Sequence, residues 1–141
     1  MPVDRSLVAR RVAMALAVAT CLVQGAAWAE PVPASEAAQR GFQLLLRQDS
    51  GCVLCHRIPG LPVGGDIGPS LEGLSARASA PEVRQRIADP RRFNPLTLMP
   101  AYLSLTGLTN VAQAYQGKTI LTEQGLDDIV AYLMQSDRVR P

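Results

Sequence analysis

Apolar residues recur at helical spacing in three separate parts of the chain. The first part, residues 36–47, follows Ser35, whose side chain is a candidate N-cap. The second, residues 79–88, begins with the capping-box pattern of a serine followed three positions later by a glutamate. The third runs from near Thr122 to about Ser136. The predicted apolar faces are Ala38, Phe42, Leu45 and Leu46 in the first helix, and Leu126, Ile129, Val130 and Leu133 in the last.

The segments between these helices are predicted to be irregular. Residues 58–73 are rich in glycine and proline, and residues 91–102 are interrupted by proline. Residues 110–115 are expected to add only a short helical turn. No stretch shows the alternation of a strand, so the pattern predicts an all-α chain. Long loops bury little apolar surface on each other, so a chain of this kind needs something large at its centre.

The first 29 residues have the features of a secretory signal peptide. Three arginines precede an apolar run over residues 12–23, and Ala27-Trp28-Ala29 provides the small-residue cleavage pattern. A retained transmembrane anchor is an alternative, but the run stops well short of the roughly 20 residues that a spanning helix needs. Lipid attachment at Cys21 is a second alternative, which the residues around it disfavour. We expect residues 1–29 to be removed, which implies a periplasmic protein with no membrane span in its mature form.

Removal of that segment changes the charge of the protein. The whole chain carries a formal charge of +2, whereas residues 30–141 hold eleven basic and eleven acidic side chains and are formally neutral. No basic field remains to attract nucleic acid, so no nucleic-acid partner is expected. We divide the chain into a removed signal peptide (1–29), an N-terminal lead-in (30–35), a single domain (36–136) and a C-terminal tail (137–141).

The segment Cys52-Val53-Leu54-Cys55-His56 has the C-x-x-C-H spacing of a c-type haem attachment site. In such a site the two thiols bond to the vinyl groups of the haem, and the imidazole of the next residue is the proximal iron ligand. A thiol–disulfide pair would need the strands of a βαβ setting, which the pattern lacks. A zinc site would need a fourth ligand, and no cysteine or histidine follows His56. We therefore predict one haem c per chain, attached covalently through Cys52 and Cys55.

Haem iron has a second axial position, and His56 is the only histidine of the chain. Beyond the signal peptide the candidates are two methionines. Met134 falls in the last predicted helix, where packing in the core is the expected role. Met99 lies in a loop and precedes Pro100, which restricts the backbone, so its polarisable thioether can be held toward a metal. We predict Met99 as the distal ligand.

The proximal imidazole needs a partner for its second ring nitrogen, because that hydrogen bond orients the ring and tunes the iron. The segment Gly68-Pro69-Ser70-Leu71 lies in the loop that has to fold back toward His56. The backbone carbonyl of Pro69 is the expected acceptor. The alternative is that Gly68-Pro69 only forms a turn.

Together these residues resemble a class I cytochrome c. The resemblance rests on the first helix, the motif at 52–56, the Gly-Pro loop, Met99-Pro100 and the last helix. Within this class, three segments are similar to the X subunit of the sulfur-oxidising (Sox) system. They are Gly65–Leu71, Asp89–Tyr102 and Tyr115–Leu133, and the run Gln-Gly-Lys-Thr-Ile-Leu-Thr in the last of them is the most specific.

This resemblance implies a class I cytochrome c fold, in which the N- and C-terminal helices pack around the covalent haem between long Gly/Pro-rich loops. It also implies a larger haem-containing A subunit as partner, with which the X subunit couples thiosulfate oxidatively to a cysteine of a sulfur-carrier protein. The sulfur chemistry then belongs to the A subunit, and the X-type haem passes electrons to a downstream acceptor cytochrome. The chain would be the electron-transfer subunit of an L-cysteine S-thiosulfotransferase complex.

Two other functions stay open from the sequence. A freely diffusing class I cytochrome c electron shuttle shares every haem residue. A five-coordinate gas sensor or peroxidase-like enzyme requires that Met99 does not bind the iron. For docking to a haem partner, the sequence suggests the apolar residues that flank the motif and the methionine loop: Val53, Leu54, Ile58, Leu61, Leu98 and Ala101.

Overall fold

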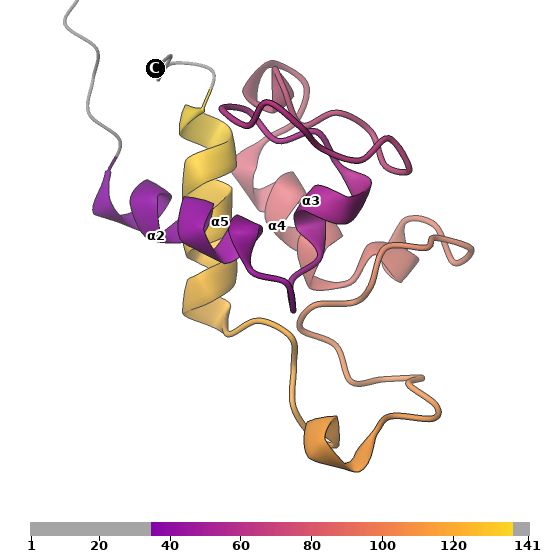
Figure 1. Ribbon diagram of the computed structural model, residues 1–141. Coiled ribbons are helices and arrows are strands. Elements are labelled where there is room, and N and C mark those ends of the chain that lie inside the picture. The colour runs from indigo at the N-terminus through magenta and orange to yellow at the C-terminus, as the bar shows by residue number, and fades with distance from the viewer. Residues whose placement is uncertain (1–34, 137–141) are drawn as a thin grey trace, which may run out of the picture. The chain divides into compact units, whose positions relative to one another are not determined.

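Two helices from opposite ends of the described chain cross each other at the centre of the fold. The computed structural model describes residues 35–136, in which α2 (Glu36–Leu46) crosses α5 (Glu123–Gln135) (Figure 1). Both helices begin at a side-chain cap: the hydroxyl of Ser35 accepts from the Ala38 N–H at 3.2 Å, and that of Thr122 from the Gly125 N–H at 3.0 Å.

The crossing is held by polar and aromatic contacts as well as by apolar packing. The Asp128 carboxylate is only 3% exposed, and Arg40 donates to both of its oxygens, at 2.8 and 2.9 Å. Gln124 donates to the same carboxylate at 3.0 Å. The rings of Phe42 and Tyr132 lie 5.0 Å apart, in a tilted arrangement. The Arg40–Asp128 and Phe42–Tyr132 contacts join residues far apart in the sequence, so they make the two ends of the domain one packed unit.

The remaining elements are short. They are α3 (Cys52–Cys55), α4 (Ala80–Ala88) and the three 3-10 turns η1 (Leu74–Ala76), η2 (Pro90–Arg92) and η3 (Gln113–Tyr115). Residues 35–136 contain no strand, so the predicted all-α class is confirmed. The predicted helix boundaries are met to within one residue at most ends, because the caps that define them are local sequence features.

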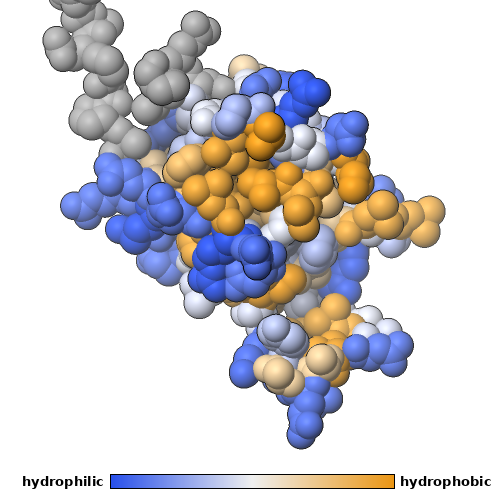
Figure 2. Space-filling model, viewed as in Figure 1, coloured by the Kyte–Doolittle hydropathy of each residue, from blue (hydrophilic) through white to orange (hydrophobic). Residues whose placement is uncertain are grey.

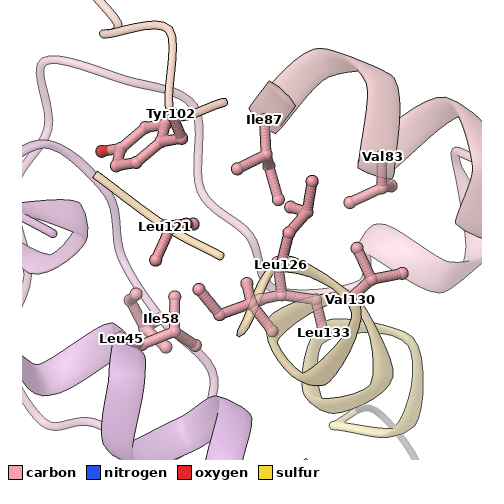
Figure 3. Close-up of a cluster of buried hydrophobic side chains, with 10 residues drawn as sticks. Leu45, Ile58, Val83, Ile87, Tyr102, Leu121, Leu126, Val130 and Leu133 are labelled. Atoms are coloured by element: carbon pink, nitrogen blue, oxygen red, sulfur yellow. The ribbon is translucent and has the colours of Figure 1, made fainter. Parts of the chain in front are cut away.

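The core lies where α2, α4 and α5 meet (Figure 3). The cluster includes Leu45 from α2, Val83 and Ile87 from α4 and the apolar face of α5, and three loop residues, Ile58, Tyr102 and Leu121, complete it. The predicted face of α5 is confirmed, since Leu126, Ile129, Val130 and Leu133 are all buried.

The predicted face of α2 is wrong at one position. Leu46 is 40% exposed, and Leu44 packs against the core instead. Leu44 and Leu46 lie about 100° to either side of Leu45 around the helix, and the core lies on the Leu44 side, so Leu46 turns outward.

The described residues fall within one compact unit, Pro31–Pro141. The predicted signal peptide, almost all of the lead-in and the tail 137–141 lie outside the described residues. Among the helices of residues 35–136, none has both the length and the apolar character that a membrane crossing requires.

Candidate haem-binding site

The short helix α3 carries the C-x-x-C-H motif. Gly51 precedes it in the left-handed conformation, with φ 63°, a backbone geometry that favours glycine. Cys52 and Cys55 stand one helical turn apart, and neither forms a disulfide within the described chain. Burial raises the pKa of the Cys52 thiol. His56 then leaves the helix in an extended conformation, which sends its side chain in a new direction.

The His56 imidazole is anchored by the loop that follows it. Its Nδ1 lies 2.7 Å from the carbonyl oxygen of Pro69. Because a carbonyl oxygen can only accept, Nδ1 carries the proton and donates it, which leaves Nε2 with its lone pair. The ring is therefore in the form that can bind a metal through Nε2.

The loop reaches His56 because it runs back along the motif. The N–H groups of Gly65, Gly68 and Leu71 donate to the carbonyls of Val53, Cys55 and Arg57, at 2.9, 2.7 and 2.9 Å. These bonds tie the loop to α3 and to the residues just after it, and they bring the Pro69 carbonyl to the imidazole.

Two glycines make this close approach possible. A Cβ atom on Gly65 would overlap the backbone carbonyl of Leu54. One on Gly68 would lie 2.7 Å from Nδ1 of His56 and 2.9 Å from Nε2, closer than any side chain can sit. The glycines that marked this segment as irregular in the sequence therefore let it pack against the motif.

Tyr102 is a site residue that sequence reasoning did not single out. Its side chain is 3% exposed, and its hydroxyl donates to the backbone carbonyl of Ser50 at 2.6 Å. The same hydroxyl lies 4.0 Å from the sulfur of Cys52. Burial raises the pKa of this phenol well above its ordinary value, so it stays a hydrogen-bond donor. The only sequence signal was its place shortly after Met99-Pro100.

Met99 lies in the loop after η2, is partly buried and packs against the core cluster. Its N–H donates to the Thr97 hydroxyl at 3.1 Å. Met134, on α5, is also partly buried and packs against the same cluster. Next to Met99, Leu98 is 86% exposed, and Leu54 of the motif is 69% exposed. Figure 2 shows apolar side chains gathered over the middle of the face on which α3 lies in Figure 1.

These residues fit a covalently attached haem. Two free thiols one turn apart suit two thioether bonds, the Nε2 lone pair of His56 suits an axial position, and apolar side chains surround them. Within residues 35–136, no group of three or more His, Cys, Asp or Glu side chains is placed to bind a metal ion without a haem.

A helical fold with this motif defines a c-type cytochrome. The chain belongs to the cytochrome c family, since the family model described as "Cytochrome c" matches residues 38–137. It therefore binds haem c covalently and transfers electrons, and its fold is that of a class I cytochrome c.

A solved structure gives a more specific likeness. The chain is similar to a chain in the crystal structure of SoxXA from P. pantotrophus, with a TM-score of 0.62 and 26% sequence identity. The match covers 71% of this chain and 81% of that one. The resemblance to a Sox cytochrome, first drawn from the sequence, is thereby confirmed. A comparison with the curated proteins found no match.

Proposed function

We propose that this chain is the electron-accepting subunit of a periplasmic heterodimeric cytochrome complex that couples thiosulfate oxidatively to a cysteine of a sulfur-carrier protein. The observation that carries this proposal is the similarity to SoxXA over most of both chains. The partner is then a larger haem-containing subunit, and the electrons leave to a downstream acceptor cytochrome.

The proposed haem site uses four residues directly. Cys52 and Cys55 would form the thioether bonds, His56 would bind the iron through Nε2, and Met99 would bind it through its sulfur. The Pro69 carbonyl holds the imidazole in place, as the 2.7 Å contact supports. The haem itself supplies a centre that takes up and gives back one electron at a time.

This ligand set suits an electron relay. A methionine together with a histidine would raise the reduction potential of the iron, which favours acceptance of electrons. Two protein ligands leave no open position for substrate, so the joining of two sulfur atoms has to occur on the partner. That joining releases two electrons, and a relay of one-electron centres carries them away.

Fewer of the residues suggested from the sequence for docking to a haem partner are exposed than expected. Of the six candidates, Ile58 and Ala101 are buried, and Val53 and Leu61 are partly buried and pack on the core. Leu54 and Leu98 remain well exposed, one on the motif and one in the methionine loop. We assign the partner contact to this pair.

Two alternatives have distinct consequences. A freely diffusing electron shuttle would show no stable partner, and a five-coordinate sensor or peroxidase-like enzyme would lack the sulfur-to-iron absorption band of the oxidised protein. The decisive experiment is a pull-down of the tagged holoprotein from periplasm, with haem staining of the proteins that come with it. A larger haem protein in the eluate supports the proposal, and elution of the chain alone at high and low salt contradicts it.

A further inference from the structure

Arg91 joins the two ends of the loop that carries Met99. Its Nε and Nη2 donate to the two carboxylate oxygens of Asp89, each at 2.8 Å, in a forked pair. On the far side of the loop, Nη2 donates to the Ser104 hydroxyl at 3.1 Å and Nη1 to the Thr106 carbonyl at 2.7 Å. One guanidinium thus spans the residues that enter and leave the loop, and we call this arrangement the neck.

Backbone hydrogen bonds lie directly beside the neck. The Tyr102 N–H donates to the Ile87 carbonyl at 3.4 Å, and the Leu103 N–H donates to the Ala88 carbonyl at 3.0 Å. The returning segment of the loop therefore lies along the end of α4. Arg91 adds charge-assisted bonds to this junction, which are about twice as strong as neutral ones.

Inside the loop the hydrogen bonds are local. The Leu96 N–H donates to the Asn94 side chain, the Thr97 N–H to the Asn94 carbonyl and the Met99 N–H to the Thr97 hydroxyl. Such contacts shape the loop but do not set where it stands relative to α4. The neck fixes both ends of the loop, and a loop closed at its ends has few other positions to reach. The Phe93 ring under Arg86 of α4 and the packing of Met99 on the core add to this placement.

We propose that Arg91 is a positioning residue, which closes the neck and so holds the Met99 thioether at the iron. The inference rests on the proposed ligation by Met99. Arginine suits the role because its planar fork binds Asp89 bidentately while its remaining N–H groups reach the other side, which a lysine cannot do. The pairing holds the Asp89 pKa at about 2, so the neck stays closed at neutral pH.

The test uses the holoprotein and three variants: Arg91→Gln, Arg91→Lys and, as matched control, Arg92→Gln at the adjacent exposed arginine. The first measurement is the binding of imidazole, which competes with Met99 for the iron. Arg91→Gln is expected to raise the apparent imidazole affinity about tenfold, because it removes the guanidinium that makes four bonds of the closed neck and only part of their combined strength is passed on to Met99 ligation. Arg91→Lys should fall between the parent and Arg91→Gln, and Arg92→Gln should stay within about twofold of the parent.

The second measurement separates positioning from general stability. On heating, the sulfur-to-iron band reports Met99 ligation, and far-ultraviolet circular dichroism reports the helices. In Arg91→Gln the midpoint temperature for loss of the sulfur-to-iron band should fall further than the midpoint temperature for loss of the helical signal. Equal falls of both midpoints, or an unchanged imidazole affinity, would overturn the proposal.

Two further controls ensure that every outcome tests the proposal. If Arg91→Gln yields no folded holoprotein, Ser104→Ala keeps Arg91 but removes the hydroxyl that accepts from its Nη2 and from the Thr106 N–H. This variant should raise the imidazole affinity about twofold to threefold; no rise would count against the neck. If the unsubstituted protein lacks the sulfur-to-iron band, Met99 is not a ligand. The neck proposal then falls with it, for a reason visible before any variant is made.

Discussion

A Cβ atom on Gly41 would overlap the backbone carbonyl oxygen of Asp128, so α2 and α5 touch through bare backbone at their crossing. The same atom would lie 2.8 Å from the Ile129 N–H nitrogen, and backbone atoms cannot move aside as a flexible side chain does. The whole arrangement of core and haem motif depends on this approach, because α2 leads directly into the C-x-x-C-H segment.

Gly41→Ala is therefore expected to destabilise the holoprotein by about 3 kcal/mol, at the upper end for overpacking in a tightly packed interior. Gly125→Ala is the matched control in the same helix pair. A Cβ there meets only the Thr122 hydroxyl and a Leu44 methyl, at 3.2 and 3.3 Å, and alanine favours the helix by about 1 kcal/mol. Denaturant unfolding followed by circular dichroism measures both. Similar losses in the two variants would contradict the backbone contact.

The methionine assignment predicts a contrast between two variants. Met99→Ala should keep the haem attached, because the thioether bonds do not involve the sixth ligand, but should lose the sulfur-to-iron band. Met134→Ala should keep the band and cost about 1–2 kcal/mol of stability through lost packing on the core. Absorption spectra of the oxidised proteins check both. Retention of the band in Met99→Ala would remove Met99 from the site.

Tyr102→Phe should measure how much a single buried hydrogen bond contributes to the free energy of unfolding. Loss of the hydroxyl leaves the Ser50 carbonyl without this donor beside Cys52, at a cost of about 1–2 kcal/mol. For a domain of this size that corresponds to a fall of about 5–10 °C in the thermal midpoint. Tyr115→Phe is the control, since Tyr115 is 67% exposed and should change the midpoint by about 1 °C or less.

Acid should weaken the neck in a defined range of pH. Arg91 donates to Asp89 and lowers its pKa from 3.8 to about 2 in the folded protein. A lowered folded pKa means that ionised Asp89 stabilises the fold above its unfolded pKa, and that this stabilisation is lost as the pH falls from about 4 to about 2. Asp89→Asn should lose less stability over this range than the parent does. Unfolding curves at several pH values test this, and parallel losses would exclude Asp89 as a contributor.

Docking through an apolar face predicts weak dependence on salt. Residues 30–141 are formally neutral, so association with the proposed haem partner should change little between low and high ionic strength. Leu98→Glu should weaken association by about tenfold or more, as for a central interface residue. Leu108→Glu, a control at an exposed leucine of a different loop, should have less effect. A larger effect at Leu108 would place the interface elsewhere.

Much of the molecule could be read from local sequence. The helices were predictable because their signals lie within a few residues of each other, as in the Ser35 cap and the serine-glutamate box at 79–82. The apolar face of α5 followed from its spacing, and all four predicted residues are buried. The haem motif could be recognised for a similar reason, because attachment needs two thiols and an imidazole on one short segment.

The contacts that span the sequence were decided only by the tertiary structure. Nothing local to Arg91 marked it as the link between Asp89, Ser104 and Thr106. Tyr102 likewise acquires its role from Ser50, which lies 52 residues earlier. Gly41 acquires its role only when α5 packs against it. The sequence placed Gly68 in an irregular loop but did not show that the His56 ring lies directly against it. Periodicity and capping report what a segment does with its own neighbours, whereas close approach and hydrogen bonding across the fold depend on which distant segment packs there.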